Sequence, residues 1–96
     1  MTRRVVRVST QVVDYAKRLA PEPRRTIKVG LESLREERGD IRALEANLSG
    51  YYRLRVGKYR LIFNYAADGA IEVIFIEERQ LVYELFEALF LKRLKS

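Results

Sequence analysis

Two hairpin turns in the second half of the chain constrain the fold more than any other feature of the sequence. Residues 51–56, 59–65 and 71–76 change to a period of two, as expected of strands that bury one face. Gly57-Lys58 separates the first two segments and Asp68-Gly69 precedes the third, and both pairs favour tight turns. The pattern therefore predicts a three-stranded meander.

The first half of the chain predicts one edge strand and two helices. Residues 3–9 alternate like a half-buried strand, and Ser9 or Thr10 can cap the helix that follows. Pro21 and Pro23 end that helix, and a second helix begins near Pro23. The apolar positions at helical spacing are Val12, Ala16 and Leu19 in the first helix and Ile27, Leu31 and Leu34 in the second. The short connection makes the two a helix hairpin.

The remaining segments complete the predicted order. Gly39 suits the C′ position of the second helix, and residues 41–48 carry no clean period and predict an irregular connection. Residues 81–94 return to helical spacing and predict a terminal helix. The fold class is therefore α+β in the order β-α-α-β-β-β-α, within a single domain over residues 1–96. We expect a small, largely antiparallel sheet with the N-terminal helix hairpin on one face.

Composition excludes several classes of chemistry. The chain has no Cys and no His, which excludes disulfides, the usual zinc sites and His-dependent nucleophiles, so we expect neither a metal nor a cofactor. The 19 Lys and Arg residues against 13 Asp and Glu give a net charge of +6, which favours an anionic partner such as nucleic acid. Because residues 1–7 lack the apolar run of a signal peptide and residues 81–91 are too short to span a membrane, we expect a soluble, cytoplasmic protein.

Three arginines in two adjacent predicted strands form the strongest local signal. Alternation places Arg53 and Arg55 on one face of their strand, and Arg60 converges with them if the turn aligns the two faces. Such a cluster of guanidinium groups suits a phosphate. The alternative is an ordinary solvated sheet face, in which Glu72 or Glu78 pairs with these arginines.

Two motifs resemble those of the RelE/ParE superfamily of bacterial and archaeal toxins. The first is the run Tyr-Arg-Leu-Arg-Val-Gly-Lys-Tyr-Arg-Leu-Ile-Phe over residues 52–63, and the second is Arg-Gln-Leu-Val-Tyr over residues 79–83. The predicted order of elements is also similar to that of the superfamily over essentially the whole chain. The resemblance implies the toxin of a type II toxin-antitoxin system, held inactive by a cognate antitoxin protein.

For a RelE-like member, the resemblance further implies a metal-independent endoribonuclease that cleaves mRNA on the ribosome and inhibits translation. The 2′-hydroxyl attacks the adjacent phosphate in this chemistry. By position in the motifs, Arg60 and Arg79 stabilise the transition state, while Arg53 and Arg55 contact phosphate or assist proton transfer. Tyr83 stacks on a base or transfers a proton. Lys58 is expected to contact the RNA backbone, and Tyr52 to stack on a base or, as is commoner for a strand tyrosine, to pack in the core.

Other functions stay open at this point. Many relatives carry His or Lys just before the C-terminal arginine, whereas Glu77 and Glu78 stand there in this chain. These carboxylates would repel RNA or pair with Arg79. The alternative hypothesis of a ParE-like toxin that binds DNA gyrase without nuclease activity therefore stays open. A non-catalytic RNA- or protein-binding module on the same scaffold is a third possibility. Part of the apolar surface of the predicted terminal helix would receive the antitoxin or a second copy, unless it completes the core.

Overall fold

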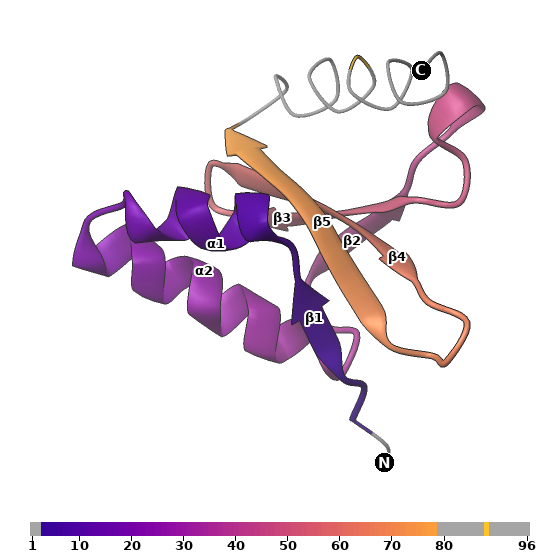
Figure 1. Cartoon of the computed structure of the whole chain (residues 1–96), viewed down its shortest axis with the longest axis horizontal. Helices are drawn as coiled ribbons and strands as arrows, with labels where there is room; N and C mark the ends of the chain where they lie inside the picture. The colour runs from indigo at the N-terminus through magenta and orange to yellow at the C-terminus, as the bar shows by residue number, and fades with distance from the viewer. Residues whose placement is uncertain (1–2, 79–87, 89–96) are drawn as a thin grey trace.

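A computed structural model of the chain describes residues 3–78 and Ala88 (Figure 1). The elements follow the order β1 (Val6–Val8), α1 (Thr10–Lys17), α2 (Pro21–Leu34), β2 (Asp40–Ala43), a 3-10 turn η1 (Ala46–Leu48), β3 (Tyr52–Val56), β4 (Tyr59–Tyr65) and β5 (Ile71–Glu78). The fold is α+β, which confirms the predicted class. The helix expected over residues 81–94 lies outside the described residues. Within the part described, none of the helices combines the length and the hydropathy needed to cross a membrane.

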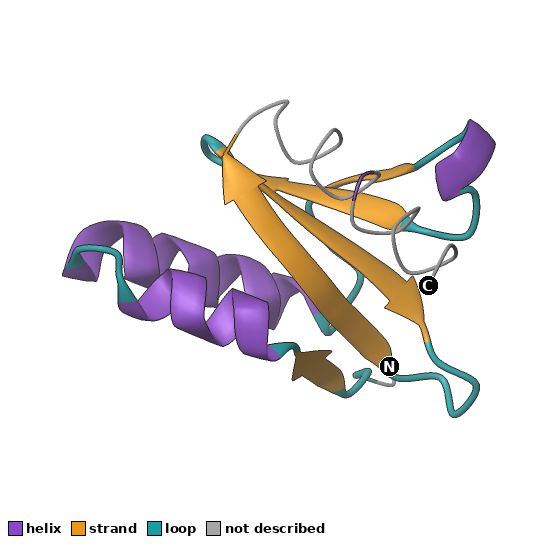
Figure 2. Cartoon of the chain, turned by 45° about the horizontal axis from the view of Figure 1, so that its top comes forward, coloured by secondary structure: helices purple, strands orange, loops and turns teal. Residues whose placement is uncertain are grey.

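A five-stranded mixed sheet forms the centre of the molecule, with the strand order β1-β5-β4-β3-β2. β2, β3, β4 and β5 pair antiparallel, and only β1 joins in parallel, at the edge beside β5 (Figure 2). The β3–β4–β5 meander is thus confirmed, with its two turns at the predicted positions. Gly57 and Gly69 adopt φ values of 58° and 88°, a left-handed conformation that glycine reaches without steric cost.

The helix hairpin α1–α2 packs on one face of the sheet, as expected. Ser9 caps α1 by accepting a hydrogen bond from the Val12 amide, and Pro21 occupies the first turn of α2, where its missing N–H has no role. The Arg24 guanidinium of α2 donates to the carbonyls of Ala16, Lys17 and Leu19 at 2.9–3.3 Å. One side chain therefore satisfies the C-terminal carbonyls of α1 and fixes the corner between the helices.

The main core lies between the helices and the sheet. Its fully buried members include Val12 and Ile27 from the helices and Leu61, Phe63 and Ile71 from the strands. A second, smaller cluster of Leu48, Ile62 and Phe75 lies on the other face. Both faces of the sheet thus contribute to stability, and the second face is apolar only over part of its area.

Gly30 brings α2 unusually close to β3. A Cβ atom added at Gly30 would lie 2.7 Å from Cγ2 of Val56, closer than side-chain atoms can approach. Any larger residue would therefore displace the Val56 side chain or move the helix away from the sheet.

A bulge interrupts the pairing of β4 with β5. Ile62 is opposite Phe75, but its neighbour Phe63 is opposite Val73, so Ile74 is an extra residue in β5. Phe75 belongs to the second cluster and Ile74 packs against it, whereas Ile76 returns to the main core. The bulge explains why the strict alternation expected for this strand is broken in the sequence.

Two expectations were wrong. Residues 40–43 form β2, a strand that pairs with β3, where an irregular connection was predicted. The strand has only four residues, and Ile41 is the only one of them whose side chain is partly buried. One apolar position cannot produce a detectable alternation of apolar and polar residues. Gly39 is also not the C′ residue of α2, because the helix ends at Leu34, and Glu37 and Gly39 both take positive φ in the loop that follows.

Candidate nucleic-acid interface

Four arginines lie on the sheet face opposite the helices. They are Arg42 of β2, Arg53 and Arg55 of β3, and Arg60 of β4, and we call this set the arginine surface. Their neighbours Ile41, Leu54 and Leu61 point into the main core, so alternation directs the arginines to the other side. The sheet thus brings Arg53, Arg55 and Arg60 to one face.

The strand register places these arginines directly opposite one another. Arg42 is paired with Arg53, and Arg55 with Arg60. Directly opposed residues on antiparallel strands have Cβ atoms about 5 Å apart, and like charges in this relation repel. Two such pairs on adjacent strands concentrate positive charge, and a bound anion would relieve the repulsion.

Arg53 differs from the other three because it is buried. Its Nη2 atom donates to Asp40 Oδ1 at 2.9 Å, while only 8% of the residue is exposed. Its Nε atom is buried and has no hydrogen-bond partner. Asp40 is directly opposite Arg55 in the register. Its carboxylate therefore lies between the Arg55–Arg60 pair and Arg53, to which it is bonded. Arg53 therefore has part of its charge balanced within the protein.

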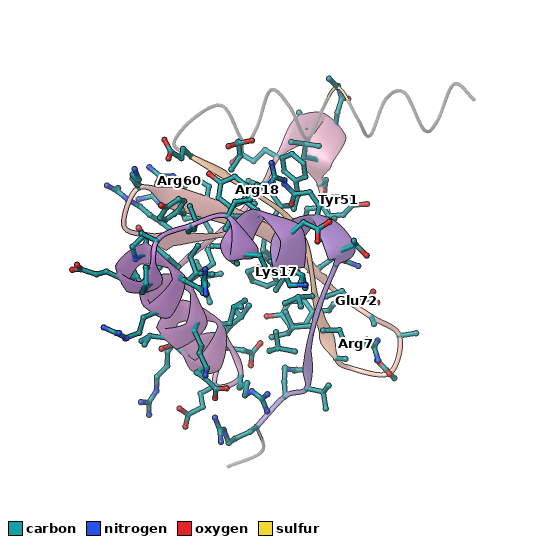
Figure 3. All side chains as sticks on the ribbon, turned by 60° about the vertical axis from the view of Figure 1, so that its left-hand side comes forward. Arg7, Lys17, Arg18, Tyr51, Arg60 and Glu72 are labelled. Atoms are coloured by element: carbon teal, nitrogen blue, oxygen red, sulfur yellow. The ribbon has the colours of Figure 1, made fainter. Side chains whose placement is uncertain are left out.

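The other three arginines have no ion-pair partner within residues 3–78. Arg42 and Arg55 are exposed, and Arg60 is half-buried and donates to the carbonyls of Gly57 and Tyr59 at 3.4 and 3.3 Å. Figure 3 shows Arg60 on the sheet, whereas Lys17 is the last residue of α1 and Arg18 is its C-cap. Glu72 pairs with Arg7 at 3.6 Å and Glu78 with Lys58 at 3.2 Å, so neither neutralises the arginine surface as the alternative had it.

Two of the expected contact residues have partners within the chain. Tyr52 lies on the helix side of the sheet, stacked on Phe63 with ring centroids 5.5 Å apart, and it packs against the main core. Lys58 occupies the β3–β4 turn beside Glu78, with its ammonium 5.6 Å from the ring centroid of Tyr59. The packing alternative therefore accounts for Tyr52, and the Lys58 ammonium is already paired.

Glu77 and Glu78, which stand where many relatives carry a basic residue, also have partners. Burial, followed by the charges of both carboxylates and a hydrogen bond with Glu77, raises the pKa of the Tyr15 hydroxyl of α1. Glu77 Oε1 also accepts from the Glu78 amide at 3.2 Å. Both carboxylates thus interact within the chain at the end of β5.

The other expected site residues, Arg79 and Tyr83, lie outside the described residues. Sequence reasoning missed Arg42, which the structure adds to the cluster through the unexpected strand β2. The only signal was the short polar-apolar-polar run Asp40-Ile41-Arg42 after Gly39. Among residues 3–78, no group of three or more acidic side chains forms a cluster that could hold a metal ion.

Comparisons with known proteins give solved structures only. No protein-family profile matches the chain, and neither does any curated protein sequence. The archaeal RelE-RelB complex from Pyrococcus horikoshii OT3 contains a chain that is 28% identical to this one, with a TM-score of 0.66, and the match covers 83% of this chain and 98% of that chain.

Two further complexes contain the same fold. The toxin-antitoxin complex RelBE2 from Mycobacterium tuberculosis matches at 21% identity and a TM-score of 0.66, over 80% of this chain and 99% of that one. The RelB-RelE antitoxin-toxin complex from Methanococcus jannaschii matches at 24% identity and a TM-score of 0.64, over 83% and 98%. The chain is thus similar to these proteins over nearly their full length.

Proposed function

We propose that this chain, which has the fold of the RelE-like toxins, is the toxin of a toxin-antitoxin pair and acts as an endoribonuclease on mRNA. The similar structures are described as complexes of a toxin with an antitoxin, which supports a protein antitoxin as the partner. The observation that carries the nuclease part is the register that sets Arg55 opposite Arg60. Asp40 and Glu77 lie opposite them on the outer strands, but neither guanidinium forms an ion pair within residues 3–78.

The arginine surface suits an RNA backbone. Each phosphate carries one negative charge, and a guanidinium binds two of its oxygens through parallel hydrogen bonds. Arg42, Arg55 and Arg60 can bind phosphate without first breaking an ion pair within the described chain. Arg53, held by Asp40, contributes a fixed positive charge behind them.

The proposed reaction needs no metal. The ribose 2′-hydroxyl attacks the adjacent phosphorus, the P–O5′ bond breaks, and the products are a 2′,3′-cyclic phosphate and a free 5′-hydroxyl. One proton leaves the 2′-oxygen and one reaches the 5′-oxygen, so the protons balance. Negative charge grows on the non-bridging oxygens in the transition state, and Arg55 and Arg60 would stabilise it at a fixed position.

Arg79 and Tyr83 are part of the same proposal. Arg79 would add a third positive charge at the phosphate, and Tyr83 would stack on a base or move a proton. With no histidine in the chain, proton transfer falls to such groups or to water. Action on mRNA at the ribosome would place the protein in the cytoplasm.

The test is controlled expression with mapping of mRNA ends. We expect growth arrest, inhibited translation and new 5′ ends within coding regions. Arg60→Ala and Arg55→Ala should each lower the cleavage rate by about a hundredfold, the usual cost of one transition-state contact. Arg18→Ala, which removes the exposed arginine at the C-cap of α1, is the matched control and should leave cleavage unchanged.

Two outcomes would contradict the proposal. Unimpaired cleavage by a folded double variant Arg55→Ala/Arg60→Ala would exclude the arginine surface as the site. Growth arrest with intact mRNA and an SOS response would instead indicate a gyrase-binding toxin on the same fold.

A further inference from the structure

Four charged residues form one row across the sheet, on the face opposite the helices. In strand order the row is Asp40 of β2, Arg55 of β3, Arg60 of β4 and Glu77 of β5, and we call it the charged row. Each member is directly opposite the next in the register, and residues in this relation have Cβ atoms about 5 Å apart. The two positive groups thus stand between two carboxylates.

The two carboxylates of the charged row differ in what they bind. Asp40 accepts a hydrogen bond at 2.9 Å from the buried Arg53, so its charge balances a cation within the protein. Glu77 is opposite Arg60 but forms no ion pair with a basic side chain of residues 3–78. It accepts hydrogen bonds from the Glu78 amide at 3.2 Å and from the Tyr15 hydroxyl. A carboxylate offers about four acceptor sites, so these bonds orient Glu77 and leave it able to take up a proton.

Helix α1 fixes the end of β5 that carries Glu77. β1 pairs with β5 only as far as Val73. Beyond that point the Gln11 side chain donates to the Ile76 carbonyl and accepts from the Ile76 amide, both at 2.9 Å. The Gln11 amide group therefore replaces a neighbouring strand immediately before Glu77. Tyr15, one helical turn after Gln11, holds the carboxylate itself. Such a fixed position is what a group that exchanges a proton with a bound substrate needs.

The proposed cleavage needs a group that removes the proton from the 2′-hydroxyl. The chain has no histidine, and arginine and lysine side chains hold their protons at neutral pH. Glutamate is ordinarily ionised there and is able to accept one. A phosphate bound by Arg55 and Arg60 would lie beside the next strand, about 5 Å away, from which Glu77 projects on the same face. The ribose that adjoins this phosphate would then lie within reach of the Glu77 carboxylate.

We propose that Glu77 is the general base of the cleavage. Its carboxylate takes the proton of the 2′-hydroxyl as that oxygen attacks the adjacent phosphorus and the P–O5′ bond breaks. The 5′-oxygen takes a proton from water, and the protonated Glu77 returns its proton to the solvent, so that atoms and charges balance. Arg60, on the neighbouring strand, stabilises the charge that grows on the phosphate oxygens. The inference rests on the proposed function, because it assigns one step of that reaction.

The test is single-turnover cleavage of an mRNA bound to ribosomes, with the full-length protein in excess. Glu77→Gln keeps the size of the side chain and an acceptor for the Glu78 amide, but it removes the base. We expect the rate constant at saturating protein to fall by about a hundredfold or more, the usual contribution of a general base. The half-saturating protein concentration should stay the same or fall, because a negative charge beside the RNA is removed.

Two further variants accompany this measurement. Glu72→Gln is the matched control, because Glu72 lies on the same strand and the same face, where it pairs with Arg7 at 3.6 Å. It should leave the rate constant unchanged. Glu77→Asp keeps a carboxylate one methylene shorter and should cleave faster than Glu77→Gln. Thermal unfolding confirms that each variant is folded, and a Glu77→Asp variant no faster than a folded Glu77→Gln would overturn the proposal.

A substrate with sulfur in place of the 5′-oxygen distinguishes a general base from a general acid. A thiolate leaves without taking up a proton, so this substrate needs no acid, whereas the 2′-hydroxyl must still lose its proton. Glu77→Gln should therefore be slower than the parent by the same factor on both substrates. A rate equal to that of the parent on the sulfur substrate would place Glu77 at the leaving group and would overturn the proposal.

Other outcomes separate this inference from the proposed function. Equal or faster cleavage by Glu77→Gln would mean that the carboxylate only repels RNA, which would overturn the inference and leave the nuclease standing. A loss that appears only in the half-saturating concentration would assign Glu77 to RNA binding and would likewise overturn the inference alone. Absence of cleavage by the parent would refute both.

Discussion

Asp40 Oδ1 accepts a hydrogen bond from Arg53 Nη2 at 2.9 Å. The arginine side chain is buried, with 9% of its surface exposed, whereas the Asp40 side chain is 50% exposed. Breaking such a pair leaves a buried cation without its partner. We expect Asp40→Ala to lower the free energy of unfolding by about 1–3 kcal/mol. Arg53→Met should cost less, because it removes the buried charge along with the pair. Urea unfolding checks both.

The control for this pair is Glu32, which binds Arg3 and Arg35 at the surface with all three side chains about half exposed. Glu32→Ala should change stability by less than about 0.5 kcal/mol. If Glu32→Ala and Asp40→Ala lowered the free energy of unfolding equally, the burial of Arg53 would add nothing to the stability that its ion pair contributes.

Gly30→Ala should destabilise the protein although alanine is the better helix former. Helix propensity favours alanine over glycine by about 1 kcal/mol. The new Cβ atom, however, would lie 2.7 Å from Cγ2 of Val56. Such overpacking typically costs about 1–3 kcal/mol of stability. In a Val56→Ala background the clash disappears, so the same change should be neutral or stabilising. A double-mutant cycle measured by thermal unfolding tests this, and identical effects in the two backgrounds would contradict it.

Stability should fall in alkaline solution because of Tyr65. Burial, followed by the hydrogen bond that its hydroxyl donates to Glu37 Oε1 at 2.6 Å, raises the pKa of Tyr65 to about 12. The unfolded chain releases this proton near the ordinary tyrosine pKa of 10.0. The contribution of Tyr65 to the free energy of unfolding is therefore complete below that pH and is lost as the pH rises toward 12.

Chemical unfolding between pH 9 and 12 measures the effect, and Tyr65→Phe should reduce its slope. Part of the slope should persist in that variant, because the pKa of Tyr15 is also raised. An unchanged slope in Tyr65→Phe would show that Tyr65 titrates alike in the folded and unfolded states.

Arg42→Ala should weaken RNA binding without abolishing cleavage. Arg42 is exposed and opposes Arg53 rather than the Arg55–Arg60 pair, so it is placed to contact a neighbouring phosphate. Loss of one phosphate contact should reduce the slope of log affinity against log salt concentration by about 1. Filter binding at several salt concentrations checks this. A slope equal to that of the parent would remove Arg42 from the interface.

The sequence predicted the parts of the fold that short-range chemistry determines. Gly57-Lys58 and Asp68-Gly69 fixed the meander, because few residues other than glycine adopt those turn conformations without strain. The strand β2 could not be predicted, since what stabilises it is pairing with β3 and not its own four residues. The end of α2 was also misplaced, because Glu37 adopts a positive φ that glycine usually takes.

The same distinction applies to the candidate site. Alternation was enough to put Arg53 and Arg55 on one face, but their environments differ because of Asp40, which comes from the unexpected strand. Arg42 was missed for the same reason. Tyr52 follows the alternation of β3 to the helix side, where Phe63 covers it. Which arginines are exposed and which tyrosines are buried depends on neighbours distant in sequence.

The parallel strand β1 ties the two ends of the described chain together. Ser9, which follows β1, and Gln11 of α1 bond to backbone groups of Ile74 and Ile76, 65 positions later. During synthesis, the N-terminal strand and helix therefore stay without their partner until β5 has emerged from the ribosomal tunnel. Contacts of such long range form late in folding. A truncated nascent chain that ends before β5 would have no completed sheet, so β1 would be left with an unpaired edge and α1 without the strand it packs on.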